Sequence, residues 1–226
     1  MLKGDYSAVP PNKCKIFIVR HGETLFNKLN KIQGWSDSPL TELGEKRIGN
    51  VAKSLSKNNF CHAYSSDSGR AVKTCEIILA EQNNQVKHSK TDILREWCYG
   101  SNEGSAKAEF IRKIIAKVPQ YNRENSLQEN FSFHSFSEIV EQLDRLGYPE
   151  NFPAIQRKVD EYLRKIAARH LNRGEQNILV VSHGLTILTF LNGINDRITF
   201  QTPLKNGEVI EVEYAAEKFN ILNKDL

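Results

Sequence analysis

Short hydrophobic runs alternate with segments of helical periodicity along most of this chain. The runs at 14–19, 60–64 and 177–182 have the length and apolar content of buried strands, and the first and last are rich in β-branched residues. Residues 85–89 predict another strand. At 207–214 apolar residues alternate with glutamates, which predicts an edge strand, and 218–222 is expected to pair with it.

Helical patterns follow these runs. Thr41 is a plausible N-cap, and Ile48, Val51, Ala52 and Leu55 then recur at the spacing of one buried helix face. Further helices are predicted around 71–79 and at 107–118, 137–146, 154–171 and 185–191. Strands that alternate with helices predict an α/β fold, a three-layer α/β/α arrangement with a mostly parallel central sheet.

Residues 105–149 interrupt this alternation. They contain two short amphipathic helices, a polar middle at 122–130, and three closely spaced phenylalanines, Phe131, Phe133 and Phe136. We interpret the block as a helical cap inserted into a single domain that spans 1–226. The three rings either select the leaving group of a substrate or dock the cap onto the core, and the sequence leaves both possibilities open.

Composition narrows the class of protein only moderately. The chain has 226 residues, 39% apolar and 26% charged, which is typical of a globular domain. The net charge of +4 is scattered, so we expect no nucleic-acid partner. No membrane-length apolar run and no secretory signal in the first 13 residues are evident, so a cytoplasmic protein is expected. Four cysteines without C-x-x-C spacing predict reduced core thiols.

Two of the predicted strands end in the same chemistry. Arg20-His21-Gly22 follows the first, and His183-Gly184 follows the strand at 177–182. If both strands are central and parallel, both histidines emerge at one sheet edge, where open α/β sheets bind ligands. Arginine offers a fork of donors to phosphate, and histidine is a nucleophile or base. The other histidines, at 62, 88, 134 and 170, are interpreted as structural or surface residues.

The run Arg20-His21-Gly22-Glu23-Thr24 with Asn27, and its continuation through 33–44, resembles the histidine phosphatase superfamily, the phosphoglycerate-mutase-like family. Further blocks around Arg70 and Glu96 also match, although Asn102 replaces a tryptophan that is usual there. The resemblance implies a phosphohistidine mechanism. Its catalytic residues would be the nucleophile His21, the phosphate ligands Arg20, Arg70 and His183, and the proton donor Glu96. Its substrate-binding residues would be Arg20, Asn27, Thr24, Gln33, Gly34, Arg70 and Gly184.

Two activities are compatible with this resemblance, and we favour the phosphatase. The Leu-Asn-Lys and Trp-Arg-Arg blocks of the cofactor-dependent mutases are absent, whereas the run at 33–40 is similar to broad-specificity phosphatases. A phosphoglycerate mutase is the first alternative, and a non-catalytic phosphate-binding module is the second. No metal or cofactor is expected, because two arginines can supply the positive charge. The expected partner is a small phosphorylated metabolite, bound by a monomer or homodimer.

Overall fold

The computed structural model describes residues 13–118, 131–171 and 176–223. The predicted polar stretch 122–130 and the first 12 residues lie outside this part. Within it, six strands form one sheet in the order β3-β2-β4-β1-β5-β6. Their bounds are β1 Lys13–Arg20, β2 His62–Ser66, β3 Lys87–Thr91, β4 Gln176–Ser182, β5 Val209–Ala215 and β6 Lys218–Ile221. The four strands from β3 to β1 are parallel, and β5 and β6 are antiparallel to their neighbours.

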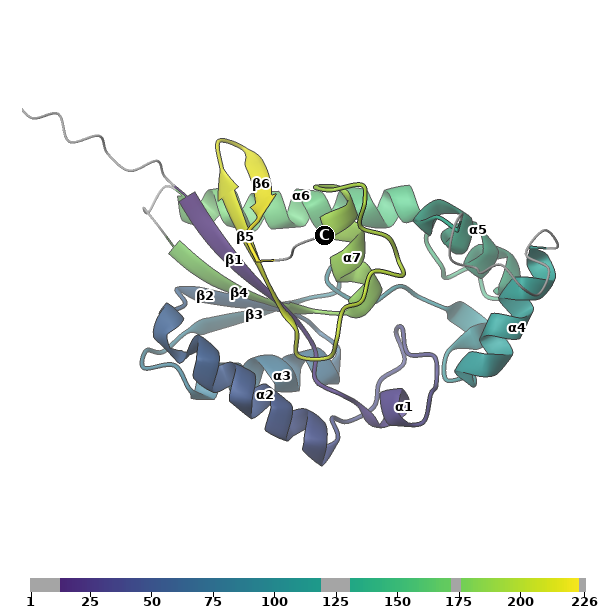
Figure 1. Ribbon diagram of the computed structural model, residues 1–226, viewed down its shortest axis with the longest axis horizontal. Coiled ribbons are helices and arrows are strands. Elements are labelled where there is room, and N and C mark those ends of the chain that lie inside the picture. Colours follow the sequence, from purple (N-terminus) through teal and green to yellow (C-terminus); the bar gives the residue numbers. More distant parts are fainter. Residues whose placement is uncertain (1–12, 119–130, 172–175, 224–226) are drawn as a thin grey trace, which may run out of the picture.

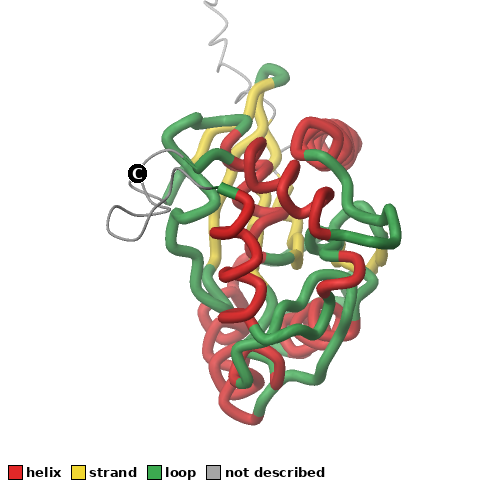
Figure 2. Tube along the Cα trace, turned by 90° about the vertical axis from the view of Figure 1, so that its right-hand side faces the viewer, coloured by secondary structure: helices red, strands yellow, loops and turns green. Residues whose placement is uncertain are grey.

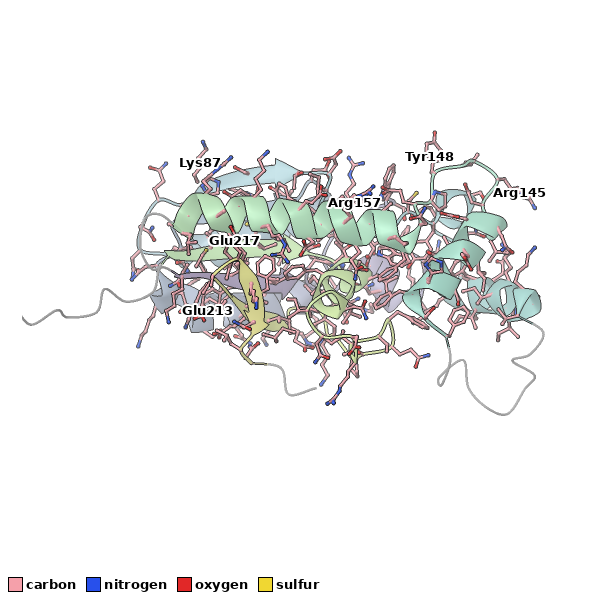
Figure 3. The ribbon with its side chains drawn as sticks, turned by 90° about the horizontal axis from the view of Figure 1, so that it is seen from above. Lys87, Arg145, Tyr148, Arg157, Glu213 and Glu217 are labelled. Atoms are coloured by element: carbon pink, nitrogen blue, oxygen red, sulfur yellow. The ribbon has the colours of Figure 1, made fainter. Side chains whose placement is uncertain are left out.

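Helices cover both faces of the sheet (Figure 1). α2 (Glu42–Leu55) and α3 (Gly69–Ala80) lie on one face, and α6 (Phe152–Leu171) and α7 (Gly184–Asn192) lie on the other. Seen from above, α6 runs along the sheet between Lys87 at the β3 edge and the β5–β6 hairpin with Glu213 and Glu217 (Figure 3). The predicted three-layer α/β/α arrangement is confirmed.

The alternation of side chains along β1 explains the two faces. Ile16 and Ile18 belong to the apolar cluster on the α6 and α7 side, whereas Phe17 and Val19 belong to the cluster that includes Ile48 and its neighbours on α2 and α3. All of these side chains are buried. A strand buried on both faces is apolar at nearly every position, which is why 16–19 is a continuous hydrophobic run.

The first long helix begins as predicted. Thr41 has an extended backbone, and its hydroxyl accepts the N–H of Gly44 at 2.9 Å. Glu42 and Glu45 lie in the first turn, where carboxylates favour the helix dipole. This cap fixes the end of the preceding loop, which carries residues of the site.

Two predictions differ from the structure, the edge strand at 207–214 and the loop at 27–40. The strand at 207–214 is not an edge strand, because β5 pairs with β1 on one side and β6 on the other, so β6 forms the edge. Its alternating glutamates reflect the one polar face of an antiparallel strand rather than an open edge. The predicted loop at 27–40 is also preceded by a short helix, α1 (Leu25–Lys28), with Thr24 as N-cap.

The helix predicted at 137–146 is shifted toward the N-terminus. α5 spans Phe133–Leu143, and the hydroxyl of Ser132 accepts the N–H of Ser135 as its cap. Gly147 does not close it. The Asp144 carboxylate instead accepts the backbone N–H groups of Leu146, Gly147 and Tyr148, which stabilises a turn directly after the helix.

The α4–α5 segment lies at one end of the molecule. α4 (Lys107–Lys117) and α5 contact each other, and α5 contacts α6. In Figure 1 both helices lie at the right, beyond the end of the sheet to which β1 and β4 point, and Figure 2 views the molecule from this side. Among the residues that the structure describes, no helix combines the length and apolar character needed to cross a membrane.

Candidate active site

The two histidines predicted to share a sheet edge do so. β1 and β4 are parallel neighbours, with Arg20 opposite Ser182 in the register. The N–H of His21 donates to the carbonyl of Ser182 at 3.0 Å, and the rings of His21 and His183 lie 5.1 Å apart between centroids. Both side chains are buried, with 4% and 0% of their surface exposed. The end of one strand pair therefore brings two imidazoles together in a water-poor position.

His21 is oriented by its own neighbour. Its Nδ1 lies 2.8 Å from the carbonyl oxygen of Gly22, which only accepts hydrogen bonds, so Nδ1 carries the proton. Nε2 then holds the free lone pair. Burial, and next the charges of Arg70 and Arg20, hold the pKa of His21 well below its usual value. A neutral imidazole with an unprotonated Nε2 is the form that can act as a nucleophile.

His183 has the opposite tautomer. Arg70 donates from Nε to Nδ1 of His183 at 3.1 Å, and since a guanidinium only donates, the proton of this imidazole resides on Nε2. Burial is the largest cause that holds the pKa of His183 well below its usual value, followed by Arg70 and His21. Nε2 is buried and has no hydrogen-bond partner among the described residues. The site therefore contains a buried donor that an oxyanion would satisfy.

Arg70 is enclosed by protein groups. It comes from the first turn of α3 and is 1% exposed. Besides His183, it donates to Asp37 and to the carbonyls of Ser36 and Gly34, at 2.7 to 2.9 Å. These bonds account for four of the five N–H donors of a guanidinium. One N–H on Nη2 is left for a ligand.

Arg20 has more free donors. Nη1 donates to the carbonyl of Leu204 at 2.5 Å, and the buried Nε has no acceptor among the described residues. Burial lowers the pKa of Arg20, which the nearby Glu96 opposes. The backbone of Gly184 lies against the guanidinium, since a Cβ there would be 3.4 Å from Cζ and Nε. Glycine at this position leaves the guanidinium accessible from the start of α7.

Glu96 lies at the N-terminus of α7. Its Oε2 accepts the N–H of Leu185 at 3.1 Å, and its Oε1 accepts the N–H of Thr186 at 3.0 Å. Free helix N–H groups favour a carboxylate at this position. Oε2 has no second donor among the described residues, so it can face a substrate. The strand-end histidine His183 and Glu96 are thereby fixed by the same helix.

Thr24 and Gln33, two of the remaining predicted substrate-binding residues, are held by the protein itself. The hydroxyl of Thr24 caps α1 and donates to Oε1 of Gln33 at 2.7 Å, and Nε2 of Gln33 donates to Ser38. Gly34 supplies its carbonyl to Arg70. Asn27 has its Oδ1 engaged by the N–H of Thr24, whereas its amide nitrogen has no protein partner in the described chain. Asn27 and the second N–H of the Gln33 amide are thus the donors among these four that are free for substrate, and both residues line the cavity described below.

Three supporting residues were not identified from the sequence. Asn206 donates from Nδ2 to the carbonyl of His21 at 3.0 Å. Glu103 accepts the backbone N–H groups of residues 34–36 and of Tyr99, at 2.8 to 3.0 Å. Asp37 forms the ion pair with Arg70. Asp37 and Glu103 lie inside the runs that carried the resemblance, so a signal existed for them. Nothing in the sequence points to Asn206.

A cavity of about 900 Å³ lies beside the site; Arg20 and Glu96 line it, whereas His21, Arg70 and His183 are buried and are not among its lining residues. Its polar side includes Arg20, Asn27, Gln33, Glu96 and Gly184, and its rim includes Lys31 and Lys107. The rest of its wall is largely apolar and comes from α4, α5, α7 and the loop before β5. These apolar residues are Phe110, Ile111, Ile114, Phe131, Phe136, Leu185, Leu188, Phe200 and Leu204. The cavity can hold a phosphate at one end and an apolar group at the other.

Other reactive groups lie apart from the cavity. The cysteines of the described chain form no disulfide, and burial raises the pKa of Cys14 and Cys75 to about 12. They are unreactive core thiols. Asn102, which replaces the tryptophan usual at its position, is buried and donates to the carbonyl of Leu143. In the described residues, no group of three or more histidine, cysteine or acidic side chains is placed to hold a metal ion.

Comparison with known proteins identifies the class. A model of the histidine phosphatase superfamily (branch 1) matches residues 16–225, so the chain belongs to this superfamily. The 2,3-bisphosphoglycerate-dependent phosphoglycerate mutase of Buchnera aphidicola subsp. Cinara cedri is 30% identical over 218 residues, which cover 90% of this chain and 94% of the relative. The crystal structure of phosphoglycerate mutase from Bacillus anthracis matches with a TM-score of 0.86 and 27% identity, over 95% of this chain and 93% of that chain.

A phosphatase has a similar fold. The structure of a phosphoserine phosphatase mutant from Entamoeba histolytica in complex with phosphoserine matches with a TM-score of 0.67 and 23% identity. The match covers 92% of this chain and 94% of that chain. At this identity the likeness shows the fold alone. Proteins of similar fold thus include both a mutase and a phosphatase.

Proposed function

We propose that this protein hydrolyses phosphomonoesters through a phosphohistidine on His21. The observation that carries the proposal is the pair of opposite tautomers: a lone pair on Nε2 of His21 beside an unpartnered Nε2–H on His183. A phosphoryl group placed between them meets a nucleophile and a hydrogen-bond donor at once. The unpartnered Nε of Arg20 adds a second buried donor for its oxygens.

The reaction then divides into two steps. Nε2 of His21 attacks phosphorus in line, the P–O bond to the leaving group breaks, and protonated Glu96 gives its proton to the leaving oxygen. In the second step the Glu96 carboxylate takes a proton from water, which attacks phosphorus and releases His21 and inorganic phosphate. Arg20, His183 and the remaining N–H of Arg70 hold the phosphoryl oxygens throughout.

Positive charge at the phosphoryl group comes from Arg20 and Arg70 in this scheme, so we expect turnover without a metal ion. Incubation with EDTA followed by desalting tests this expectation. Undiminished turnover is the expected result, and a loss that is reversed by a divalent cation would contradict the assignment of the two arginines.

The apolar wall of the cavity favours a substrate with a hydrophobic leaving group. Phe131 and Phe136 of the α4–α5 segment lie on this wall, so we propose that 105–149 is a cap that selects the substrate within a single domain. A three-carbon phosphoacid would leave much of the 900 Å³ empty and would place its carboxylate near aromatic rings. This contrast supports a phosphatase over a mutase.

A phosphoglycerate mutase is the second candidate. Lys31 and Lys107 lie at the rim of the same cavity and form no ion pair with another described residue, so they could hold a second anionic group. The 30% identity to a 2,3-bisphosphoglycerate-dependent mutase points the same way. In a mutase the phosphoryl group would return to the acid instead of passing to water.

One assay separates the two. The protein is incubated with 3-phosphoglycerate, with and without 2,3-bisphosphoglycerate, and in parallel with naphthyl and propyl phosphates. We expect release of inorganic phosphate from the naphthyl ester and little interconversion of 3- and 2-phosphoglycerate. Rapid, bisphosphate-dependent interconversion with phosphate conserved would establish the mutase. Failure of every ester would favour a non-catalytic phosphate-binding module.

A further inference from the structure

Asp37 forms an ion pair with Arg70 and takes no direct part in the proposed reaction. Asp37 Oδ1 lies 2.9 Å from Nη1 of Arg70. The two side chains are unequal, since that of Arg70 is fully buried and that of Asp37 is 38% exposed. A buried guanidinium without a counter-ion is strongly destabilising, and Asp37 is the acidic group within ion-pair distance of Arg70 in the described chain.

The local backbone leaves room for this contact. Gly69 precedes Arg70, and a Cβ on Gly69 would lie 2.7 Å from Oδ2 of Asp37. Any other residue at position 69 would push the carboxylate away. The other acceptors of the Nη groups are neutral carbonyls, those of Ser36 and Gly34. Asp37 is therefore the charged anchor that sets how the guanidinium is rotated.

The rotation of the guanidinium decides where Nε points. In the observed pose Nε–H meets Nδ1 of His183, and this contact places the histidine proton on Nε2. If the guanidinium turned, Nδ1 would lose its donor and the ring could carry its proton on either nitrogen. In the wrong tautomer, His183 would present a lone pair instead of a donor to the phosphoryl oxygen.

We propose that Asp37 is a positioning residue that holds Arg70 so that His183 stays in its Nε2–H tautomer. The proposal rests on the proposed phosphohistidine chemistry for its kinetic part only, because the tautomer itself can be observed without turnover. Asp37 also balances part of the charge of Arg70, so its removal raises the positive potential at the site. Its loss should therefore slow the chemical step without weakening phosphate binding.

The test compares Asp37→Ala and Asp37→Asn with a matched control. Asp160 pairs with Arg164 at 2.6 Å on α6 and is about as exposed as Asp37, whereas Arg164 is 43% exposed, so Asp160→Ala removes an aspartate–arginine pair that holds no buried guanidinium. Proteins labelled with ¹⁵N at histidine are studied by NMR, where protonated and unprotonated ring nitrogens have well-separated shifts. The reference for an unfixed ring is Arg70→Lys, which lacks Nε–H. Binding of inorganic phosphate and kcat on naphthyl phosphate are measured on the same samples.

For Asp37→Ala we expect the Nδ1 and Nε2 signals of His183 to move toward those of Arg70→Lys. We expect kcat to fall about 10-fold, with a dissociation constant for phosphate that is unchanged or lower. Asp37→Asn keeps an oxygen acceptor and should restore the tautomer signals and most of kcat. Asp160→Ala should match the wild type in all three readouts.

Unchanged His183 signals in Asp37→Ala would overturn the proposal, whether or not kcat falls. Equal weakening of kcat and phosphate binding in both Asp37 variants would also overturn it, since that is the pattern of a merely structural residue. Asp37→Ser is the substitute if the alanine variant does not fold, with the same expectations. If the wild type releases no phosphate from any ester, the NMR and binding arms still decide the role of Asp37, and the proposed function fails separately.

Discussion

The floor and the wall of the cavity are built in different ways. The floor includes Arg20 at the end of β1, and Glu96 and Gly184 at the start of α7, and the buried rings of His21 and His183 lie behind it. The side chains of this region are fixed by hydrogen bonds to backbone or side chains. The wall consists of aromatic and aliphatic side chains of the α4–α5 segment, α7 and the loop before β5, and the ring of Phe136 contacts those of Phe131 and Phe200. Directional bonds on a rigid sheet suit chemistry, and non-directional packing suits the choice of an apolar group.

The three phenylalanines of the wall differ among themselves. All are buried, which supports their docking onto the core. Phe131 and Phe136 also line the cavity, and both contact the ring of Phe200. Phe133 also contacts Phe200, with centroids 6.1 Å apart, but it does not line the cavity and stacks on Phe152 at 5.1 Å. The two interpretations of the cluster therefore apply to different members of it.

The largest effect is expected from His21→Ala, which removes the nucleophile and leaves the wall intact. Turnover should fall by roughly four orders of magnitude, and acid-labile ³²P labelling of the protein should disappear. Binding of a naphthyl phosphate, measured by calorimetry, should persist because the apolar contacts remain. His134→Ala, at an exposed position on α5, is the control. Covalent labelling that survives in His21→Ala would place the nucleophile elsewhere.

A smaller and selective effect is expected from Glu96→Gln. The glutamine has one oxygen that can accept a backbone N–H of α7 where Glu96 has two, and it cannot act as a general acid. Hydrolysis of an alkyl phosphate should slow by about 100-fold, whereas a nitrophenyl phosphate needs little protonation and should slow less than about 10-fold. The absence of a burst of leaving group in pre-steady-state kinetics would show that bond cleavage, and not breakdown of the phosphoenzyme, limits the rate. Equal losses on the two esters would remove Glu96 from the role of acid.

The sequence predicted the floor better than the wall for a physical reason. His21 and His183 each follow an apolar strand directly, so parallel pairing alone brings them together. The position of Asn206 depends on how the loop before β5 returns to β1, which is a long-range contact that no local pattern encodes. The tautomers depend on individual hydrogen-bond partners and were equally inaccessible.

The boundaries of α5 show why the sequence predicted the cavity wall less well. Gly147 is a common helix-stop signal, yet the Asp144 carboxylate ended the helix earlier by capturing three backbone amides. The helix was predicted to begin at 137, after the three phenylalanines, whereas α5 begins at Phe133 with Ser132 as its N-cap. As a result the sequence located the segment correctly and could not assign which ring faces the cavity.

Because Phe131 and Phe136 line the cavity and Phe133 does not, we expect substitutions of the first two to change substrate selectivity and substitution of the third to change stability. Phe131→Leu and Phe136→Leu should change the ratio of kcat/KM for naphthyl over propyl phosphate by about 10-fold, because each removes ring surface from the wall. Phe133→Leu should leave this ratio unchanged and lower the thermal midpoint, as a core substitution does. Steady-state kinetics and calorimetry on the three variants measure both quantities. Ratios that shift equally in all three would mean that the cap responds as one packed unit.

The smallest expected effect concerns stability of the floor as the pH falls. The pKa of His183 is held well below its usual value, chiefly by burial, so the folded protein keeps this ring neutral while the unfolded chain protonates it. Its contribution is complete above pH about 6.5 and is lost as the pH falls below that value, by at most about 1.4 kcal/mol per pH unit. Urea unfolding between pH 7 and 5.5 should show a shallower decline for His183→Gln than for the wild type. The other histidines with lowered pKa values, such as the partly exposed His62 with a pKa of about 4, are present in both proteins and cancel in the comparison. Parallel declines would show that His183 is protonated in the folded state, and an imidazolium could not accept the hydrogen bond from Arg70 on which the geometry of the floor depends.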